Sequence, residues 1–179
     1  MKMSVYIAVS LDGFIARKNG GIDWLTDRGN NSGNEDYGYK AFMDTVDILV
    51  MGRNSYEKVL TFGDWPYGDK SVIVLSRGAI KPPKNLPTSV SFSSETPVEL
   101  AGRLSAQGGA HLYIDGGVTI AGFLAAGLID EMTITRIPVI LGEGIPLFHA
   151  IEKDIPLTHI FTQAFDNGYV QSKYRVMRE

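Results

Sequence analysis

Three short apolar runs of this chain each end in residues that suit the binding of a phosphate. The runs cover residues 47–51, 71–75 and 111–114, and they are followed by Gly52-Arg53-Asn54-Ser55, Ser76-Arg77 and Asp115-Gly116-Gly117. In an open α/β sheet, ligands bind beyond the carboxyl ends of the strands, where helix N-termini present backbone N–H groups to anions. Glycine allows close approach of the backbone, and arginine adds a permanent forked charge. Together, these strand ends predict a site for a phosphorylated dinucleotide, and therefore an enzyme.

The order of the predicted elements indicates an α/β fold. Strands alternate with helices at first, whereas residues 131–141, 157–165 and 169–176 read as successive strands, the last two joined by the turn signal Asp166-Asn167-Gly168. This order predicts a single mixed sheet of about eight strands, with helices on both faces and a C-terminal antiparallel hairpin. A chain of 179 residues is expected to form one domain over residues 1–179.

Two helix starts and one helix end are marked in the sequence. Thr96-Pro97-Val98-Glu99 carries the cap, the first-turn proline and the reciprocal glutamate of a capping box. Asn54, with Glu57 three residues later, predicts a similar start after the run 47–51. Gly127 predicts the end of a helix over residues 118–126.

Charge and composition exclude several classes of function. A net charge of -3 gives no electrostatic basis for binding nucleic acid or an anionic membrane. The absence of cysteine excludes disulfides and zinc–thiolate sites. The start of the chain does not have the pattern of a signal peptide, so a cytoplasmic location is expected. The three histidines, at positions 111, 149 and 159, lack the spacing of paired metal ligands, so no metal site is expected.

Five segments in order carry a resemblance to a known family. They are residues 10–16, 20–26, 51–53, 74–77 and 114–142. The chain resembles the dihydrofolate reductase-like superfamily, and within it the reductase domain of the bifunctional riboflavin-biosynthesis deaminase–reductase and its stand-alone relatives. The His/Cys zinc signature of the deaminase half is absent, because the chain has no cysteine.

The resemblance implies NADPH as the cofactor. In this family the nicotinamide lies along the first strand and the loop after it, and the pyrophosphate rests on two helix starts. Arg53 and Arg77 would lie near the adenosine 2′-phosphate, and two arginines near one phosphate favour NADPH over NADH. The G-x-G-x-x-G fingerprint of a Rossmann site is missing, which favours a site divided between two helix starts. The cofactor-binding set is then Ala8 and Ile15 for the nicotinamide, Gly52, Arg53, Asn54, Ser55, Gly116, Gly117, Val118 and Thr119 for the pyrophosphate, and Leu75, Ser76 and Arg77 at the segment that matches the 2′-phosphate site.

Asp36 is the candidate for the catalytic acid. Its spacing of sixteen residues to Gly52 equals that between the active-site acid and the Gly-Arg motif of bacterial dihydrofolate reductases. A raised pKa in an apolar cleft would suit a proton donor, although Glu35 competes for the role and an acid at a helix start can simply serve the helix dipole. Trp24 is a candidate wall of the substrate pocket. Lys70 aligns with the arginine that clamps the folate glutamate, but offers a point charge instead of a fork.

The resemblance, together with these residues, implies an NADPH-dependent reductase that transfers hydride to a nitrogen heterocycle, most like 5-amino-6-(5-phosphoribosylamino)uracil reductase. The alternatives are a true dihydrofolate reductase and a non-catalytic NADPH-binding protein. A homodimer is expected as well, because relatives pair through their sheets and the C-terminal strands carry apolar residues, Tyr169, Val170, Tyr174 and Val176, on both faces.

Overall fold

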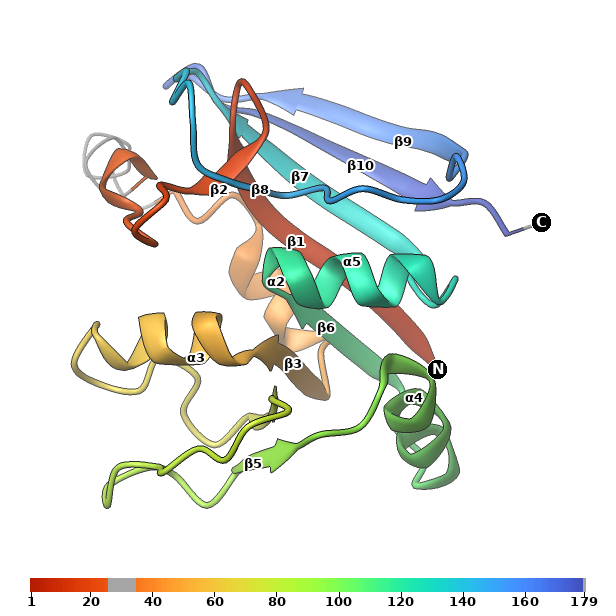
Figure 1. The fold of residues 1–179 in the computed structure, drawn as a ribbon. Coiled ribbons are helices and arrows are strands. Elements are labelled where there is room, and N and C mark those ends of the chain that lie inside the picture. The colour runs from red at the N-terminus through yellow and green to blue at the C-terminus, as the bar shows by residue number, and fades with distance from the viewer. Residues whose placement is uncertain (26–34, 179) are drawn as a thin grey trace.

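A mixed sheet of eight strands organises the protein, whose computed structural model describes residues 1–25 and 35–178. The strand order is β5-β4-β3-β6-β1-β7-β10-β9 (Figure 1). Neighbours from β5 to β7 run parallel, and β10 pairs antiparallel with both β7 and β9. The predicted α/β fold with its C-terminal hairpin is therefore confirmed. The strands are β1 (Lys2–Ser10), β3 (Ile48–Gly52), β4 (Ser71–Leu75), β5 (Val90–Ser93), β6 (His111–Asp115), β7 (Glu131–Ile137), β9 (Leu157–Ala164) and β10 (Val170–Val176).

Helices cover both faces of the parallel part of the sheet, as the continuous apolar runs predict. α4 (Pro97–Ala106) and α5 (Gly117–Ala125) pack on one face, where Leu100, Ile120 and Phe123 are fully buried. α2 (Tyr39–Asp44) and α3 (Arg53–Leu60) pack on the other face, against a cluster that includes Tyr56 and Tyr113. In Figure 1, α5 lies in front of β6 and β1, and α2 lies behind them.

The helix ends match the sequence in two of three places. In α4, Thr96 and Glu99 form the predicted capping box, and Gly127 ends α5 in a left-handed conformation with φ 65°. The prediction for Asn54 is wrong. α3 begins at Arg53, Gly52 occupies the cap position, and Glu57 pairs with Arg53 Nε at 2.7 Å instead of closing a capping box.

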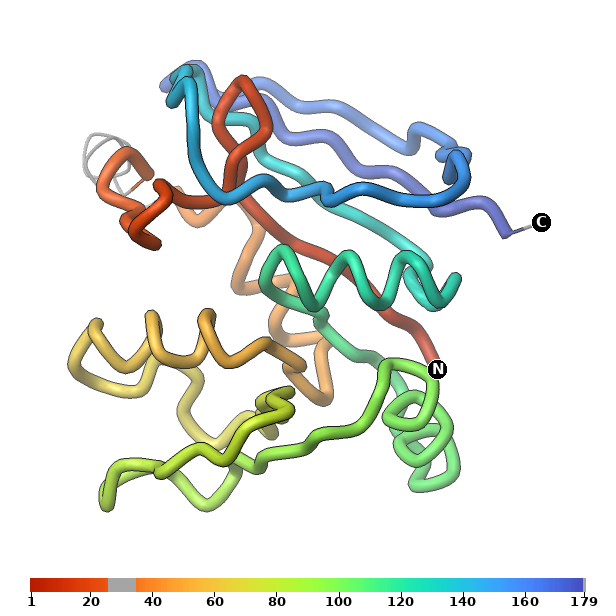
Figure 2. Tube along the Cα trace, viewed as in Figure 1, coloured from red at the N-terminus to blue at the C-terminus, as the bar shows by residue number. Residues whose placement is uncertain are grey.

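A second, two-stranded sheet differs from the predicted single sheet. β2 (Phe14–Ala16) pairs with β8 (Ile145–Pro146). The strand predicted over residues 131–141 ends at Ile137, because Pro138 has no N–H for the ladder and the chain then turns toward residues 10–16. Leu11 N donates to Val139 O at 2.8 Å, and Gly142 N donates to Asp12 Oδ2 at 2.8 Å. Figure 2 shows these distant segments side by side.

The turn between β9 and β10 is formed as predicted. Gly168 has φ 83°, and its N–H donates to Phe165 O at 2.9 Å. Of the apolar residues expected at a dimer surface, however, Tyr169 is 2% exposed and packs within the chain. None of the helices within residues 1–25 and 35–178 is long and apolar enough to cross a bilayer.

Candidate active site

Two helix N-termini meet at the carboxyl edge of the sheet. β3 leads into α3 and β6 leads into α5, and the two strands are parallel neighbours with Met51 opposite Asp115. A Cβ placed on Gly52 would lie 2.7 Å from Thr119 Oγ1, and one on Gly116 would lie 2.5 Å from Ser55 Oγ. The two helix starts therefore approach each other closely at these glycines. This contact brings together the two pyrophosphate-binding segments that the sequence predicts.

Neither of these two helix starts is capped by a side chain. Gly52 and Gly116 occupy the cap positions, neither start has a side-chain cap bond within the described residues, and neither first turn holds an acidic residue. The first N–H groups of a helix need a partner and carry the positive end of its dipole. α4, by contrast, has the complete capping box. The contrast indicates that the starts of α3 and α5 are suited to receive an anion.

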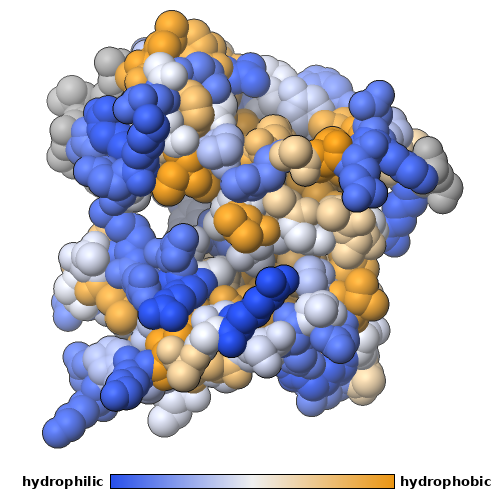
Figure 3. Space-filling model, viewed as in Figure 1, coloured by the Kyte–Doolittle hydropathy of each residue, from blue (hydrophilic) through white to orange (hydrophobic). Residues whose placement is uncertain are grey.

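The flanks of the two helix starts carry further residues of the predicted set. Ile15 Cδ1 would lie 3.1 Å from a Cβ on Gly117, so the short strand β2 covers the start of α5. Arg53 Nη1 would lie 3.5 Å from a Cβ on Gly78, which places its guanidinium beside the turn that Ser76 closes. Figure 3 shows a hollow at the left of the molecule, with hydrophilic residues on both sides of it.

The other members of the cofactor-binding set lie at the same edge. Leu75 pairs with Gly52 across β4 and β3. Val118, in the first turn of α5, is 70% exposed, and Asn54 and Arg77 are exposed as well. Ala8 lies on β1 opposite Thr135 and contacts the cluster around Trp24 and Ile137.

Asp115 is an acidic residue that the sequence reasoning treated only as part of the turn before α5. It is the last residue of β6, and burial raises the pKa of its carboxyl, against the lowering effect of the Gly116 N–H and the Tyr113 hydroxyl. Tyr113 Oη lies 3.4 Å from Asp115 Oδ1. The sequence contained a signal for a carboxyl at this edge of the sheet, because Asp115 stands directly between an apolar strand and the Gly116-Gly117 helix start.

Two further tyrosines lie near the Asp115 carboxyl. Burial, and after it the charge of Asp115, raises the pKa of Tyr39 to about 12. The same two causes raise the pKa of Tyr67. Both rings belong to the aromatic cluster under α2 and α3, which also contains Tyr56 and Trp65. The carboxyl thus borders an aromatic wall on the α2 side of the sheet.

Asp36 does not have the environment expected of a proton donor. Its side chain is exposed and accepts hydrogen bonds from Gly38 N at 2.8 Å and Lys40 N at 3.0 Å. These bonds, that of Lys40 first, lower the pKa of Asp36. The expectation of a raised pKa is therefore wrong, because the two main-chain N–H groups at the start of α2 favour the ionised carboxylate of Asp36.

The two predicted substrate residues have structural contacts of their own. Lys70 Nζ donates to Met43 O at 2.9 Å and to Val46 O at 2.6 Å, so its ammonium binds the carbonyls at the end of α2. Trp24 is 4% exposed and packs in a core cluster with Ile137 and Tyr169. Neither side chain points freely into the site around Asp115.

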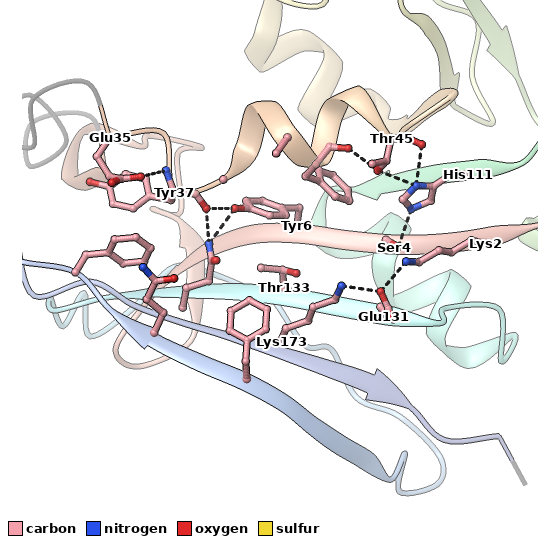
Figure 4. A pocket seen from close by; sticks show the side chains of 17 residues that line it. Lys2, Ser4, Tyr6, Glu35, Tyr37, Thr45, His111, Glu131, Thr133 and Lys173 are labelled. Carbon is pink, nitrogen blue, oxygen red and sulfur yellow. Dashed lines mark hydrogen bonds and ion pairs between the residues drawn. The ribbon is translucent and has the colours of Figure 1, made fainter.

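A groove of about 520 Å³ lies on the other flank of α2, between α2 and the strands β1, β7, β10 and β9 (Figure 4). Lys2 and Lys173 pair with Glu131 at 2.7 and 2.9 Å on its floor, and Tyr6 and Phe161 contribute aromatic walls. Over residues 1–25 and 35–178, no three His, Asp or Glu side chains gather as they would around a metal ion.

Comparison with known proteins identifies the family. The model of the RibD C-terminal domain matches residues 2–171. YwjB of Bacillus subtilis strain 168 is 40% identical over 178 residues, which cover 96% of this chain and 98% of YwjB. A structure described as a putative riboflavin biosynthesis protein from Shewanella sp. PV-4 is 44% identical, with a TM-score of 0.92 over 99% of this chain and 100% of that one.

A bifunctional relative shares the fold alone. The diaminohydroxyphosphoribosylaminopyrimidine deaminase/5-amino-6-(5-phosphoribosylamino)uracil reductase of Thermotoga maritima is 16% identical, with a TM-score of 0.71. The likeness covers 98% of this chain and 56% of that protein.

The contact between the two helix starts makes Gly116 a sensitive position. We expect Gly116→Ala to lower the free energy of unfolding by at least about 2 kcal/mol, because its φ of 89° disfavours a side chain and the added Cβ would collide with Ser55 Oγ. Gly127→Ala is the matched control, since φ is 65° there but nothing lies within 4 Å of an added Cβ. It should cost only about 1 kcal/mol. Equal losses in urea denaturation would show that the contact contributes nothing.

Proposed function

Since the chain belongs to the RibD C-terminal domain family, and is thus a reductase-like oxidoreductase, we propose that it is an NADPH-dependent reductase of a nitrogen heterocycle. The observation that carries this proposal is the pair of uncapped helix starts beside a buried carboxyl of raised pKa. The substrate class is an aminopyrimidine ribotide similar to 5-amino-6-(5-phosphoribosylamino)uracil. Steady-state oxidation of NADPH against aminopyrimidine ribotides, pteridines and simple imines tests the proposal, which fails if none is reduced.

The residues at the edge of the sheet fit a dinucleotide phosphate. A Cβ at Gly52 or Gly116 would crowd the space where the two helix starts approach each other, next to the hydroxyls of Thr119 and Ser55. Gly52 to Ser55 and Gly116 to Thr119 would hold the pyrophosphate, and Ser76 with Arg77 would hold the 2′-phosphate. Ala8 and Ile15 would flank the nicotinamide. NADPH, when bound, supplies the hydride.

The protein itself would orient the nicotinamide against the substrate, exclude water from the site and deliver a proton to the substrate. Asp115 is the proposed proton source, because burial keeps a larger fraction of its carboxyl protonated than in water. Tyr39 and Tyr67 would bound the substrate ring on the α2 side and limit access of water to the carboxyl.

One observation disfavours the alternative of a true dihydrofolate reductase. Lys70, at the position that would clamp the folate glutamate, uses its ammonium to bind two main-chain carbonyls. The other alternative, a non-catalytic NADPH-binding protein, would bind NADPH and turn over no member of the substrate panel.

The proposal predicts a preference for NADPH over NADH. Losing one charged contact to a phosphate costs about 1.5–3 kcal/mol, so Arg77→Ala should weaken NADPH binding roughly ten- to a hundred-fold. NADH binding should stay unchanged, because it lacks the 2′-phosphate. Lys81→Ala, an exposed charge in the following loop, is the control for net charge. Equal affinity of the native protein for both cofactors in fluorescence titrations would contradict the prediction.

The assignment of Asp115 predicts the behaviour of two acidic variants. Asp115→Asn should lower turnover by about 10²–10⁴ and leave NADPH binding intact. The native activity should decline as pH rises and the Asp115 acid deprotonates, and this decline should be missing in the variant. Asp36→Asn is the matched comparison and should change turnover only a few-fold, because that carboxylate is exposed and ionised. The reverse pattern would assign the proton to Asp36.

We also propose a homodimer that forms through the sheet face beside α2. All eight residues of the edge strand β9 are exposed, and Phe161 on that strand is 40% exposed in the groove. An exposed edge strand with an apolar residue on its open face favours association. Phe161→Glu should then halve the mass measured by light scattering at micromolar concentration, whereas Val98→Glu on α4 should not. A monomeric native protein would refute the dimer.

A further inference from the structure

Tyr37 holds an unusual backbone conformation directly before α2. Among the residues described, it alone has a positive φ, 57°, without being glycine. A residue with a side chain adopts this left-handed conformation only where its surroundings enforce it. The contacts around Tyr37 therefore show what fixes the start of α2.

The main-chain carbonyl of Tyr37 is held from the C-terminal part of the sheet. Gln171, on β10, is 5% exposed, and its Nε2 lies 3.0 Å from Tyr37 O, 2.9 Å from Tyr6 Oη and 3.0 Å from Thr135 Oγ1. The Tyr6 hydroxyl donates to the same Tyr37 carbonyl. Figure 4 shows the bonds among the Tyr37 carbonyl, the Tyr6 hydroxyl and the amide converging between Tyr6 and Tyr37. One buried amide thus joins three elements, β1, β7 and the segment before α2.

The ring of Tyr37 is held by the turn of the C-terminal hairpin. It stacks on Tyr169 with centroids 5.2 Å apart and meets Phe165 edge-on at 4.9 Å. Asn167 Nδ2 donates to its hydroxyl at 2.7 Å. Backbone and side chain of this residue are both attached to the same hairpin.

α2 itself depends on its ends for its position. It has six residues, and none of them is fully buried. Lys70 binds the carbonyls at its end, and the network around Tyr37 holds its start. The first residue of the helix is Tyr39, which packs edge-on against Tyr6 at 5.8 Å and lies near enough to Asp115 for that charge to raise its pKa.

We propose that Gln171 is a positioning residue, which holds the Tyr37 carbonyl and thereby places α2, with Tyr39, against the Asp115 site. The inference rests on the proposed function for its catalytic consequence, whereas the anchoring of α2 is independent of it. Gln171 lies on β10 and belongs to none of the elements that would bind the dinucleotide.

Amide hydrogen exchange measured by mass spectrometry tests the anchoring without any substrate. In Gln171→Leu, amides of residues 38–46 should exchange at least tenfold faster than in the native protein, while those of α3 and α5 keep their native rates. Gln163→Leu is the matched control, because Gln163 lies directly opposite Gln171 on β9 but is exposed. It should leave α2 unchanged.

Kinetics on the same variants test the consequence at the site. With a substrate from the panel, Gln171→Leu should lower kcat/KM at least tenfold while the Kd of NADPH stays within twofold. Tyr6→Phe removes the other donor to the same carbonyl and should act in the same direction. Because both act through one acceptor, the double variant should lose less than the product of the two single losses.

Each outcome decides the proposal. Unchanged exchange in α2, or acceleration shared equally by α3 and α5, would overturn it, and so would faster exchange in α2 with native kcat/KM. If Gln171→Leu does not fold, Tyr6→Phe alone must show the same local pattern. If the native protein reduces no substrate, the proposed function fails, and the exchange data still decide whether Gln171 anchors α2.

Discussion

The close contact between the starts of α3 and α5 is the constraint on which the rest of the site depends. β3 and β6 are parallel neighbours in register, so their carboxyl ends deliver two helices to the same point of the edge. A Cβ at Gly52 or Gly116 would lie within 2.7 Å of a hydroxyl of the other helix, which would have to move, and Gly116 also has a positive φ of 89°. The geometry that excludes side chains also leaves the first N–H groups without side-chain partners.

Two opposing effects meet at Asp115. A carboxylate near helix N-termini is stabilised in its charged form, and the Gly116 N–H and the Tyr113 hydroxyl both lower its pKa. Burial acts against them and is the larger effect, so the pKa is raised. Asp36 shows the opposite balance, because solvent and two main-chain N–H groups favour its charge. The surroundings of each carboxyl, and not its spacing to the Gly-Arg motif, therefore decide whether it can act as a proton donor.

Local patterns in the sequence predicted the local features well. The capping box at Thr96 and Glu99 and the turn at Gly168 depend on residues a few positions apart, and both formed. Asn54 failed as a cap because the backbone is already helical at Arg53, which moves the cap position to Gly52. Lys70 shows the same limit. The sequence suggested a substrate contact, and only the fold reveals that its ammonium binds two main-chain carbonyls.

The bond between Gln171 and Tyr37 joins residues 134 positions apart, and no local pattern predicts it. Its effect reaches further than the two residues, because Gln171 lies on β10, next to the edge strand β9. The face of β9 and β10 that would pair with a second copy is the face from which Gln171 holds Tyr37. A partner pressed on this face would restrict β10, and through Gln171 the start of α2. If the proposed dimer forms on this face, assembly of the sheet and order at the Asp115 site would be coupled through the buried amide of Gln171.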